Sequence, residues 1–229
     1  MLHGFLPSIL EGAVVTVTVA LCSLVIAVLL GLTGAVARLS RSRIWSYPAT
    51  LYTTLVRGIP DLVLMLLLFY GGQLLVNELA LKMGHADYID IDPFMAGVAA
   101  IGFIFGAYFT ETFRGALMSI PAGQREAALA YGLSPARTLW RITLPQMVRL
   151  AIPGFANNWL VLVKSTAIVS VIGLNDMMYK AGLAAGATRE PFTFYAGVAL
   201  LYLAITTVSV VALNALEQRY SLGVRKLRL

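Results

Sequence analysis

Long stretches without charged residues are the feature that most limits how this chain can fold. There are five: four contain no Asp, Glu, Lys or Arg, and the fifth is interrupted only by Lys164. A helix that crosses a bilayer needs about 20 mostly apolar residues. The sequence therefore predicts an all-α integral membrane protein, a single domain over 1–229 with spans over about 12–37, 61–81, 93–113, 150–175 and 191–216.

The composition indicates a bilayer rather than water as the solvent. Hydrophobic residues make up 59% of the 229 residues and charged residues only 12%, and the mean hydropathy is +0.82. A soluble domain of this length could not bury so much apolar surface. The single cysteine and the two histidines have no further ligand at metal spacing, so no metal site or redox chemistry is expected.

The distribution of basic residues predicts the orientation. Thirteen Lys and Arg residues lie on one side of the five predicted spans, against Lys82, Lys180 and Arg189 on the other. Cytoplasmic loops carry the excess of basic residues, so we expect a multi-pass membrane protein with its N-terminus on the outer side of the membrane and its C-terminus in the cytoplasm. The basic residues are scattered over three loops, which argues against nucleic-acid binding and is explained by contact with membrane lipid.

The longest cytoplasmic segment, between the third and fourth predicted spans, contains the clearest local pattern. Pro121 introduces a helix in which Glu126 lies near the N-terminal end, where the helix dipole favours a carboxylate. Ala127 and Ala128 follow, and their small side chains let a partner approach closely. Gly132 then permits a sharp turn, because glycine adopts positive φ without strain.

A second short helix is expected directly after this turn. Ser134 and Pro135 are suited to the cap and first turn of a helix. We expect that helix to run to about Leu144 and to end before Pro145, because the residue preceding a proline disfavours the α conformation. Residues 121–145 are thus predicted to form a helix-turn-helix that projects into the cytoplasm.

This segment resembles the EAA motif of ABC importer permeases. The motif is Glu-Ala-Ala, a Gly four residues later, and Ile-x-Leu-Pro after nine more. All seven positions match, at Glu126, Ala127, Ala128, Gly132, Ile142, Leu144 and Pro145. The resemblance implies a type I importer permease in which the segment is a coupling helix that docks on an ATP-hydrolysing subunit.

The chain itself is expected to have no catalytic residues and to bind no cofactor. A Gly-x-x-x-x-Gly-Lys-Ser/Thr sequence, which cradles nucleotide phosphates, does not occur in the printed sequence. The resemblance therefore implies that ATP and Mg are bound by a partner ATPase.

Other motifs are closest to the polar amino acid permeases. Arg57-Gly58-Ile59-Pro60 precedes the second predicted span, and Gly106-Ala107-Tyr108 leads to Glu111 at the end of the third. Asn157-Asn158-Trp159 and Lys164-Ser165-Thr166-Ala167 resemble the Q-type permeases of histidine/lysine/arginine/ornithine importers. The resemblance implies a cationic or polar amino acid as cargo, with opines and neutral polar amino acids as alternatives.

The same resemblance implies that the protein lies in the bacterial inner membrane with a periplasmic N-terminus, and it implies the partners. They are a second, homologous permease that forms a pseudo-twofold pair with this chain, two ABC ATPase subunits, and a periplasmic receptor that binds the amino acid. Two other classes of protein are also compatible with five spans, namely an ATP-independent channel or secondary transporter and a membrane scaffold. Neither of them explains the complete motif.

Six polar residues in or beside the spans are candidates for the substrate pathway. They are Asp61, Tyr108, Glu111, Lys164, Ser165 and Thr166. A cationic substrate needs a carboxylate or carbonyl group to compensate its charge where it leaves water. Many permeases of the family that this chain resembles have Asp where this chain has Ser165. A cation-binding carboxylate cannot simply be carried over to that position.

Each charged candidate also has a structural interpretation. Lys164 could line a cavity or pair with Glu111, but it could equally belong to a structural ion pair or extend to the membrane interface. Glu111 could face a cavity or form a local pair with Arg114, three residues later. Asp61 follows Pro60, and capping the helix of the second span is its expected role.

Overall fold

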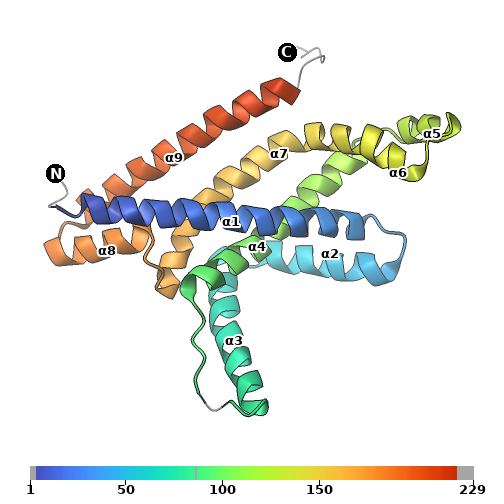
Figure 1. The fold of residues 1–229 in the computed structure, drawn as a ribbon. Helices are drawn as coiled ribbons and strands as arrows, with labels where there is room; N and C mark the ends of the chain where they lie inside the picture. Colours follow the sequence, from blue (N-terminus) through green and yellow to red (C-terminus); the bar gives the residue numbers. More distant parts are fainter. Residues whose placement is uncertain (1–3, 86, 221–229) are drawn as a thin grey trace.

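The computed structural model describes residues 4–85 and 87–220, and this part of the chain contains helices and connecting segments but no strand (Figure 1). The helices are α1 Leu6–Arg38, α2 Arg43–Gly58, α3 Asp61–Lys82, α4 Pro93–Met118, α5 Ala122–Ala130, α6 Pro135–Thr138, α7 Leu144–Ser165, α8 Met177–Thr188 and α9 Pro191–Tyr220. A π-helical turn, Leu139–Thr143, joins α6 to α7, and a 3₁₀ segment, Thr166–Ile172, follows α7.

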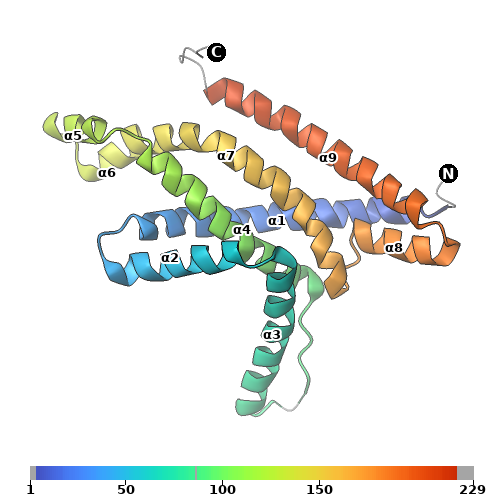
Figure 2. The same cartoon turned by 180° about the vertical axis from the view of Figure 1, so that it is seen from behind.

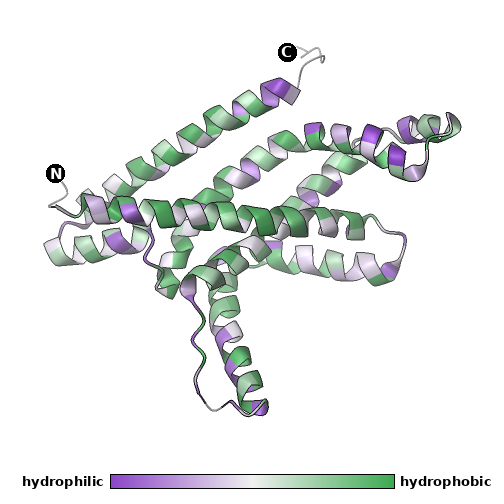
Figure 3. Cartoon of the chain, viewed as in Figure 1, coloured by the Kyte–Doolittle hydropathy of each residue, from purple (hydrophilic) through white to green (hydrophobic). Residues whose placement is uncertain are grey.

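Five of the described helical stretches are long and apolar enough to cross a membrane. They are Leu6–Arg38, Asp61–Lys82, Pro93–Met118, the continuous stretch Pro135–Ile172, and Pro191–Tyr220. Most residues of α1 and α9 are hydrophobic, and hydrophilic residues are frequent in α5 and α6 and at the C-terminal end of α9 (Figure 3). The prediction of an all-α membrane protein with five spans is confirmed.

Helices α1 and α4 form the centre of the molecule and pack against each other over the longest interface in the described chain. Glycines on both helices allow the backbones to approach closely. A Cβ atom at Gly31 would lie 2.6 Å from Phe109 Cβ, and one at Gly102 would lie 2.7 Å from Ile26 Cβ. Close contact between small residues is the usual way in which membrane helices associate.

Helix α2 was not anticipated from the sequence and changes the position of residues 43–58. The helix runs back alongside α1 (Figures 1 and 2), and the Tyr52 hydroxyl donates a hydrogen bond of 2.5 Å to the Phe103 carbonyl oxygen in the middle of α4. From the sequence these residues were expected only to belong to the basic loop between the first two predicted spans. The structure instead brings Arg57, at the end of α2, to the Tyr108 ring of α4.

Helix α3 and the segment that returns from it stand away from the other helices (Figure 1). Two amide side chains of α3 hold the returning segment in place. Asn77 exchanges hydrogen bonds of 2.9 and 2.8 Å with the backbone of Ile89, and Gln73 Oε1 accepts one of 2.9 Å from the Ile91 N–H. These bonds satisfy backbone groups that have no neighbouring strand or helix to pair with.

Asp176, between the 3₁₀ segment and α8, is fully buried against the first third of α1. Its Oδ1 caps α8 by accepting a hydrogen bond of 2.8 Å from the Tyr179 N–H, whereas Oδ2 has no partner within the described residues. Gly12 makes this contact possible, since a Cβ there would lie 2.8 Å from the Asp176 carbonyl carbon. Burial raises the pKa of the Asp176 carboxyl from 3.8 to about 6, although the backbone N–H groups of Tyr179 and Met178 partly offset this.

This carboxyl should make the stability of the protein depend on pH. The folded state binds the proton more tightly than the unfolded chain, so the stabilisation is lost as pH rises through about 6. Between about pH 5 and about pH 7.5 we expect the free energy of unfolding to fall by about 1.4 kcal/mol through this group. Asp176→Asn retains the capping oxygen but does not titrate, so its thermal unfolding in detergent should lack this part of the pH dependence. An identical pH dependence in the two proteins would assign the effect to other groups.

Candidate coupling segment and translocation pathway

The short helices α5 and α6 form an exposed hairpin at the end of the molecule opposite α8 (Figures 1 and 2). No residue of α5 is buried. Gly132 makes the turn with φ of +81°, and the Ser134 hydroxyl then accepts a hydrogen bond of 3.4 Å from the Arg137 N–H at the start of α6. Large apolar side chains are exposed at the turn of the hairpin and in the π-helical turn that follows α6, including Tyr131 at 88% and Trp140 at 68% exposure. Such a surface is suited to contact with another protein.

The seven residues of the predicted motif lie on this hairpin and on the helix that leaves it. Glu126 and Ala127 are exposed on α5 and Ala128 is half-buried beside them. Ile142 and Leu144 are half-buried, and Pro145 is exposed. The side-chain amide of Gln146 on α7 donates a hydrogen bond of 2.5 Å to the side-chain oxygen of Gln124 on α5. This bond links the two helices that carry the two ends of the motif.

The second helix of the hairpin does not end before Pro145, and this expectation was wrong. Helix α6, the π-helical turn Leu139–Thr143 and α7 continue as one helical stretch. Pro145 cannot donate to the carbonyl four residues earlier, and its ring would clash with that carbonyl in a regular α-helix. The wider π-helical turn just before it accommodates the proline. The hairpin is therefore joined without a break to a membrane-spanning helix, so a displacement of α6 would be transmitted to α7.

Glu111 lies in an ionic cluster that joins α1, α2 and α4. One carboxylate oxygen pairs with Arg38 Nη1, and the other accepts from Arg114 Nε and Nη2 at 3.0 and 2.8 Å. Arg38 Nη1 also donates to the Thr53 hydroxyl at 2.7 Å. Both oxygens are thus engaged by arginines of this chain, which supports the structural interpretation of Glu111, including its local pair with Arg114.

Lys164 does not pair with Glu111 in the structure. Its side chain lines a hollow of about 500 Å³ between α7, α8 and α9, together with Tyr195 and Tyr202. Thr166 is fully buried and donates a hydrogen bond of 2.7 Å to the Val163 carbonyl oxygen, whereas Ser165 is half-buried at the end of α7. Of the three neighbours, Lys164 is the one with an exposed side chain.

Asp61, Tyr108 and Arg57 come together where α2 meets α3. The Arg57 guanidinium carbon lies 5.6 Å from the centre of the Tyr108 ring, and Asp61 is also close enough to act on Tyr108 electrostatically. Asp61 is the first residue of α3, yet its side chain makes no capping hydrogen bond. The expected capping role is therefore not observed, although a carboxylate in the first turn is favoured by the helix dipole.

Arg57 is a residue that sequence reasoning did not select for the pathway. It was counted with the cytoplasmic basic residues of the loop before the second predicted span. Only the path of α2 alongside α1 and α4 brings it to Tyr108. The structure thus presents a cation, a phenol and a carboxylate on adjoining helices, a set of groups that can contact both charged ends of an amino acid.

The five described helical stretches long and apolar enough to cross a membrane, together with the exposed hairpin, define a multi-pass membrane protein with a surface for contact with another protein. The chain belongs to the family described as binding-protein-dependent transport system inner membrane component, which matches residues 23–222. It is 52% identical over 226 residues to the histidine/lysine/arginine/ornithine transport system permease protein HisQ of Salmonella typhimurium, with 99% of each chain covered.

Other relatives and solved structures agree with this assignment. The arginine ABC transporter permease protein ArtQ of Haemophilus influenzae is 40% identical, with 96% of this chain and 97% of the relative covered. A chain from the crystal structure of an amino acid ABC transporter with histidines has a TM-score of 0.80 at 29% identity, covering 94% and 95%. A chain of the MetNI methionine ABC transporter has a TM-score of 0.73 at 16% identity, covering 96% and 99%, and shares the fold.

Proposed function

We propose that this chain is a permease subunit of an ATP-driven importer that carries cationic or polar L-amino acids, such as histidine, arginine, lysine and ornithine, from the periplasm to the cytoplasm. The observation that carries the proposal is the similarity to the HisQ permease over 99% of both chains at 52% identity. Its partners are a second homologous permease, two ABC ATPase subunits that bind ATP and Mg, and a periplasmic amino-acid-binding receptor.

The hairpin α5–α6 supports the coupling part of this proposal. It projects from the membrane helices and presents uncovered aromatic side chains at Tyr131 and Trp140. Its continuity with α7 supports a path by which the ATPase moves the membrane helices. In the proposed orientation the hairpin is cytoplasmic and the N-terminus periplasmic, as the charge distribution predicts.

The proposed cargo needs a carboxylate, because an isolated charge is costly outside water. Glu111 is already engaged by two arginines, so we assign the cationic part of the substrate to Asp61 beside Tyr108. Arg57, whose guanidinium carbon lies 5.6 Å from the centre of the Tyr108 ring, is suited to the substrate carboxylate. Lys164 and the neighbouring Ser165 and Thr166 remain candidates for a second section of the pathway.

Reconstitution tests the proposal directly. Proteoliposomes containing this chain, the second permease and the ATPase should take up arginine or histidine only when ATP is enclosed on the ATPase side and the receptor is outside. Uptake without ATP would indicate a channel or secondary transporter. An assembly that binds its partners but transports none of the four amino acids would leave a scaffold or another cargo as the explanation.

Substitution of Gly132 should separate coupling from folding. The glycine has positive φ and no atom within 4 Å of the site of a Cβ, so Gly132→Ala meets no clash but costs about 1 kcal/mol of backbone strain at the turn. We expect the protein to insert normally but to show reduced receptor-stimulated ATPase activity. Gly123→Ala in α5, where a Cβ also has free space and φ is ordinary, is the matched control. Equal activity in both variants would argue against docking through this turn.

A further inference from the structure

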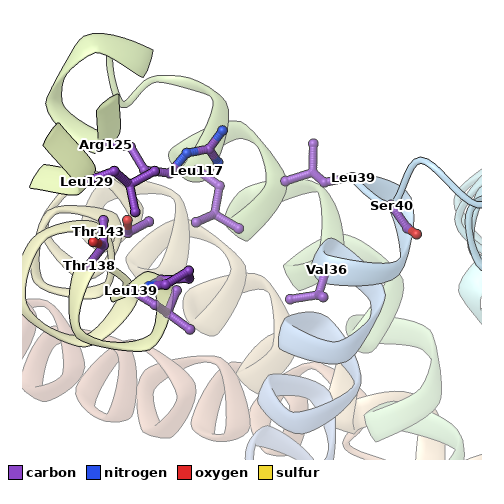
Figure 4. A pocket seen from close by; sticks show the side chains of 10 residues that line it. Val36, Leu39, Ser40, Leu117, Arg125, Leu129, Thr138, Leu139 and Thr143 are labelled. Atoms are coloured by element: carbon purple, nitrogen blue, oxygen red, sulfur yellow. The ribbon is translucent and has the colours of Figure 1, made fainter. Parts of the chain in front are cut away.

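A hollow of about 700 Å³ lies between the hairpin and the ends of α1 and α4 (Figure 4). Four of its ten lining residues are leucines: Leu39 follows the end of α1, Leu117 belongs to α4, and Leu129 and Leu139 lie on the hairpin side. In the proposed orientation the ends of α1 and α4 beside the hollow are the cytoplasmic ends of two membrane-spanning helices, so we expect lipid head groups next to them. The hollow is therefore placed where a lipid can enter it from the membrane.

A second hollow of about 500 Å³ continues the first along α1. The two share Val36 and Ser40, and the second extends to Leu32 and Trp45. The side chains of Val36 and Trp45 are both 66% exposed. Tryptophan at the edge of a membrane helix is typical of the interface between acyl chains and head groups. Together the two hollows form an apolar groove that begins among membrane-facing side chains and ends under the hairpin.

The end of the groove under the hairpin is polar. Arg125 of α5 points its guanidinium into the hollow (Figure 4) and makes no hydrogen bond or ion pair with the described residues. Thr138 also lines the hollow; the residue is 1% exposed, and its buried hydroxyl has no hydrogen-bond partner in the described chain. Buried hydroxyl groups in proteins normally have a hydrogen-bond partner, so we expect a bound molecule to supply a partner for this one.

We propose that this groove binds an anionic phospholipid, with the phosphate at Arg125 and Thr138 and an acyl chain along Val36 and the leucine walls. Arg125 would donate charge-assisted hydrogen bonds to the phosphate oxygens and Thr138 a neutral one. Basic pockets at the cytoplasmic side of membrane helices are suited to lipid head groups. A free phosphate would leave the apolar walls unused, and a zwitterionic lipid would place its own cation near Arg125.

The bound lipid would connect the end of α1 to the hairpin and hold α5 against the membrane surface. This role rests on the proposed orientation of the permease, which puts the hairpin at the cytoplasmic leaflet. Binding itself can be measured without transport. A permease that retains the lipid but fails to carry amino acids would contradict the proposed function and leave the lipid site intact. A permease that carries amino acids but does not retain the lipid would contradict the lipid site and leave the proposed function intact.

Native mass spectrometry of the full chain, purified in the assembly in which the cell makes it, tests the site. After exchange into mixed vesicles of phosphatidylglycerol and phosphatidylcholine, the protein should retain phosphatidylglycerol selectively. Arg125→Gln should lower that retention about fivefold, the effect of one basic residue at an anionic membrane surface. Arg141→Gln removes the same charge from the same segment at an exposed position outside the groove, and should change retention less than twofold.

A second variant tests the acyl part of the site without altering charge. Val36→Trp fills the groove at the point shared by its two parts, and because Val36 is 66% exposed the substitution leaves the core intact. Retention of phosphatidylglycerol should fall as it does for Arg125→Gln. Equal retention of the two lipids by the unmodified protein, or unchanged retention in both variants, would overturn the proposal. So would a partner subunit found to occupy the groove.

Discussion

Replacing Glu111 by glutamine should lower the free energy of unfolding by about 3 kcal/mol and reduce transport of every substrate alike. The Glu111 side chain is 16% exposed and forms ion pairs with Arg38 and Arg114, whose side chains are 21% and 29% exposed. Glutamine is nearly the same size but leaves both guanidinium groups without a counter-charge. Removing one partner of a largely buried ion pair is costly because the remaining charges stay desolvated.

Thermal unfolding in detergent and uptake of a cationic and a neutral amino acid would check this result together. Glu11→Gln is the matched control. Glu11 also forms an ion pair, with Lys180, but its side chain is 74% exposed, so the pair should contribute less than about 1 kcal/mol to stability. If Glu111→Gln were as stable as the unmodified protein and lost only arginine or lysine uptake, Glu111 would belong to the pathway and our structural assignment would be wrong.

Replacing Gly102 by valine should lower the stability by about 3 kcal/mol or more, enough to reduce the yield of folded protein sharply. A Cβ at this position would lie 2.7 Å from both Cβ and Cγ2 of Ile26 and 3.3 Å from the Ser23 carbonyl oxygen. Ile26 Cβ is attached directly to the backbone of α1, so it cannot move unless the helix moves. The two central helices would have to separate, and much of the core packs against their interface.

Gly115→Val provides the control for this prediction. Gly115 belongs to the same helix, α4, but a Cβ there has no neighbouring atom within 4 Å. The two variants therefore share the change in helix propensity and differ in packing alone. Fluorescence-detected size-exclusion of both proteins would compare the folded yield. A Gly102→Val protein recovered as well as Gly115→Val would show that α1 and α4 can shift apart at little cost.

The sequence by itself determined the class of fold and the position of the hairpin. Hydrophobic runs identify membrane helices because every backbone polar group in a bilayer must be paired within its own helix, which makes each span a local property of the chain. The turn at Gly132 and the cap at Ser134 are equally local, since each depends on the conformation of a few consecutive residues. These features were predictable without knowing what packs against what.

Predictions from a few consecutive residues were wrong where the conformation depends on other parts of the structure. Pro145 was expected to end a helix, but the preceding π-helical turn, Leu139–Thr143, absorbs the clash and the helix continues. Residues 43–58 were expected only to belong to the basic loop between the first two predicted spans, yet they form helix α2. Their position depends on packing against α1 and α4, including the hydrogen bond from Tyr52 to Phe103.

The partners of the charged residues were decided only by the tertiary structure. The sequence placed Arg114 three residues from Glu111, and that pair exists, but nothing local indicated that Arg38, 73 positions away, binds the same carboxylate. Nor could it indicate that Arg57 would reach Tyr108 or that Arg125 would face an apolar groove. Hydropathy depends on the composition of one segment, whereas the role of a charge depends on which distant groups the fold brings within a few ångströms of it.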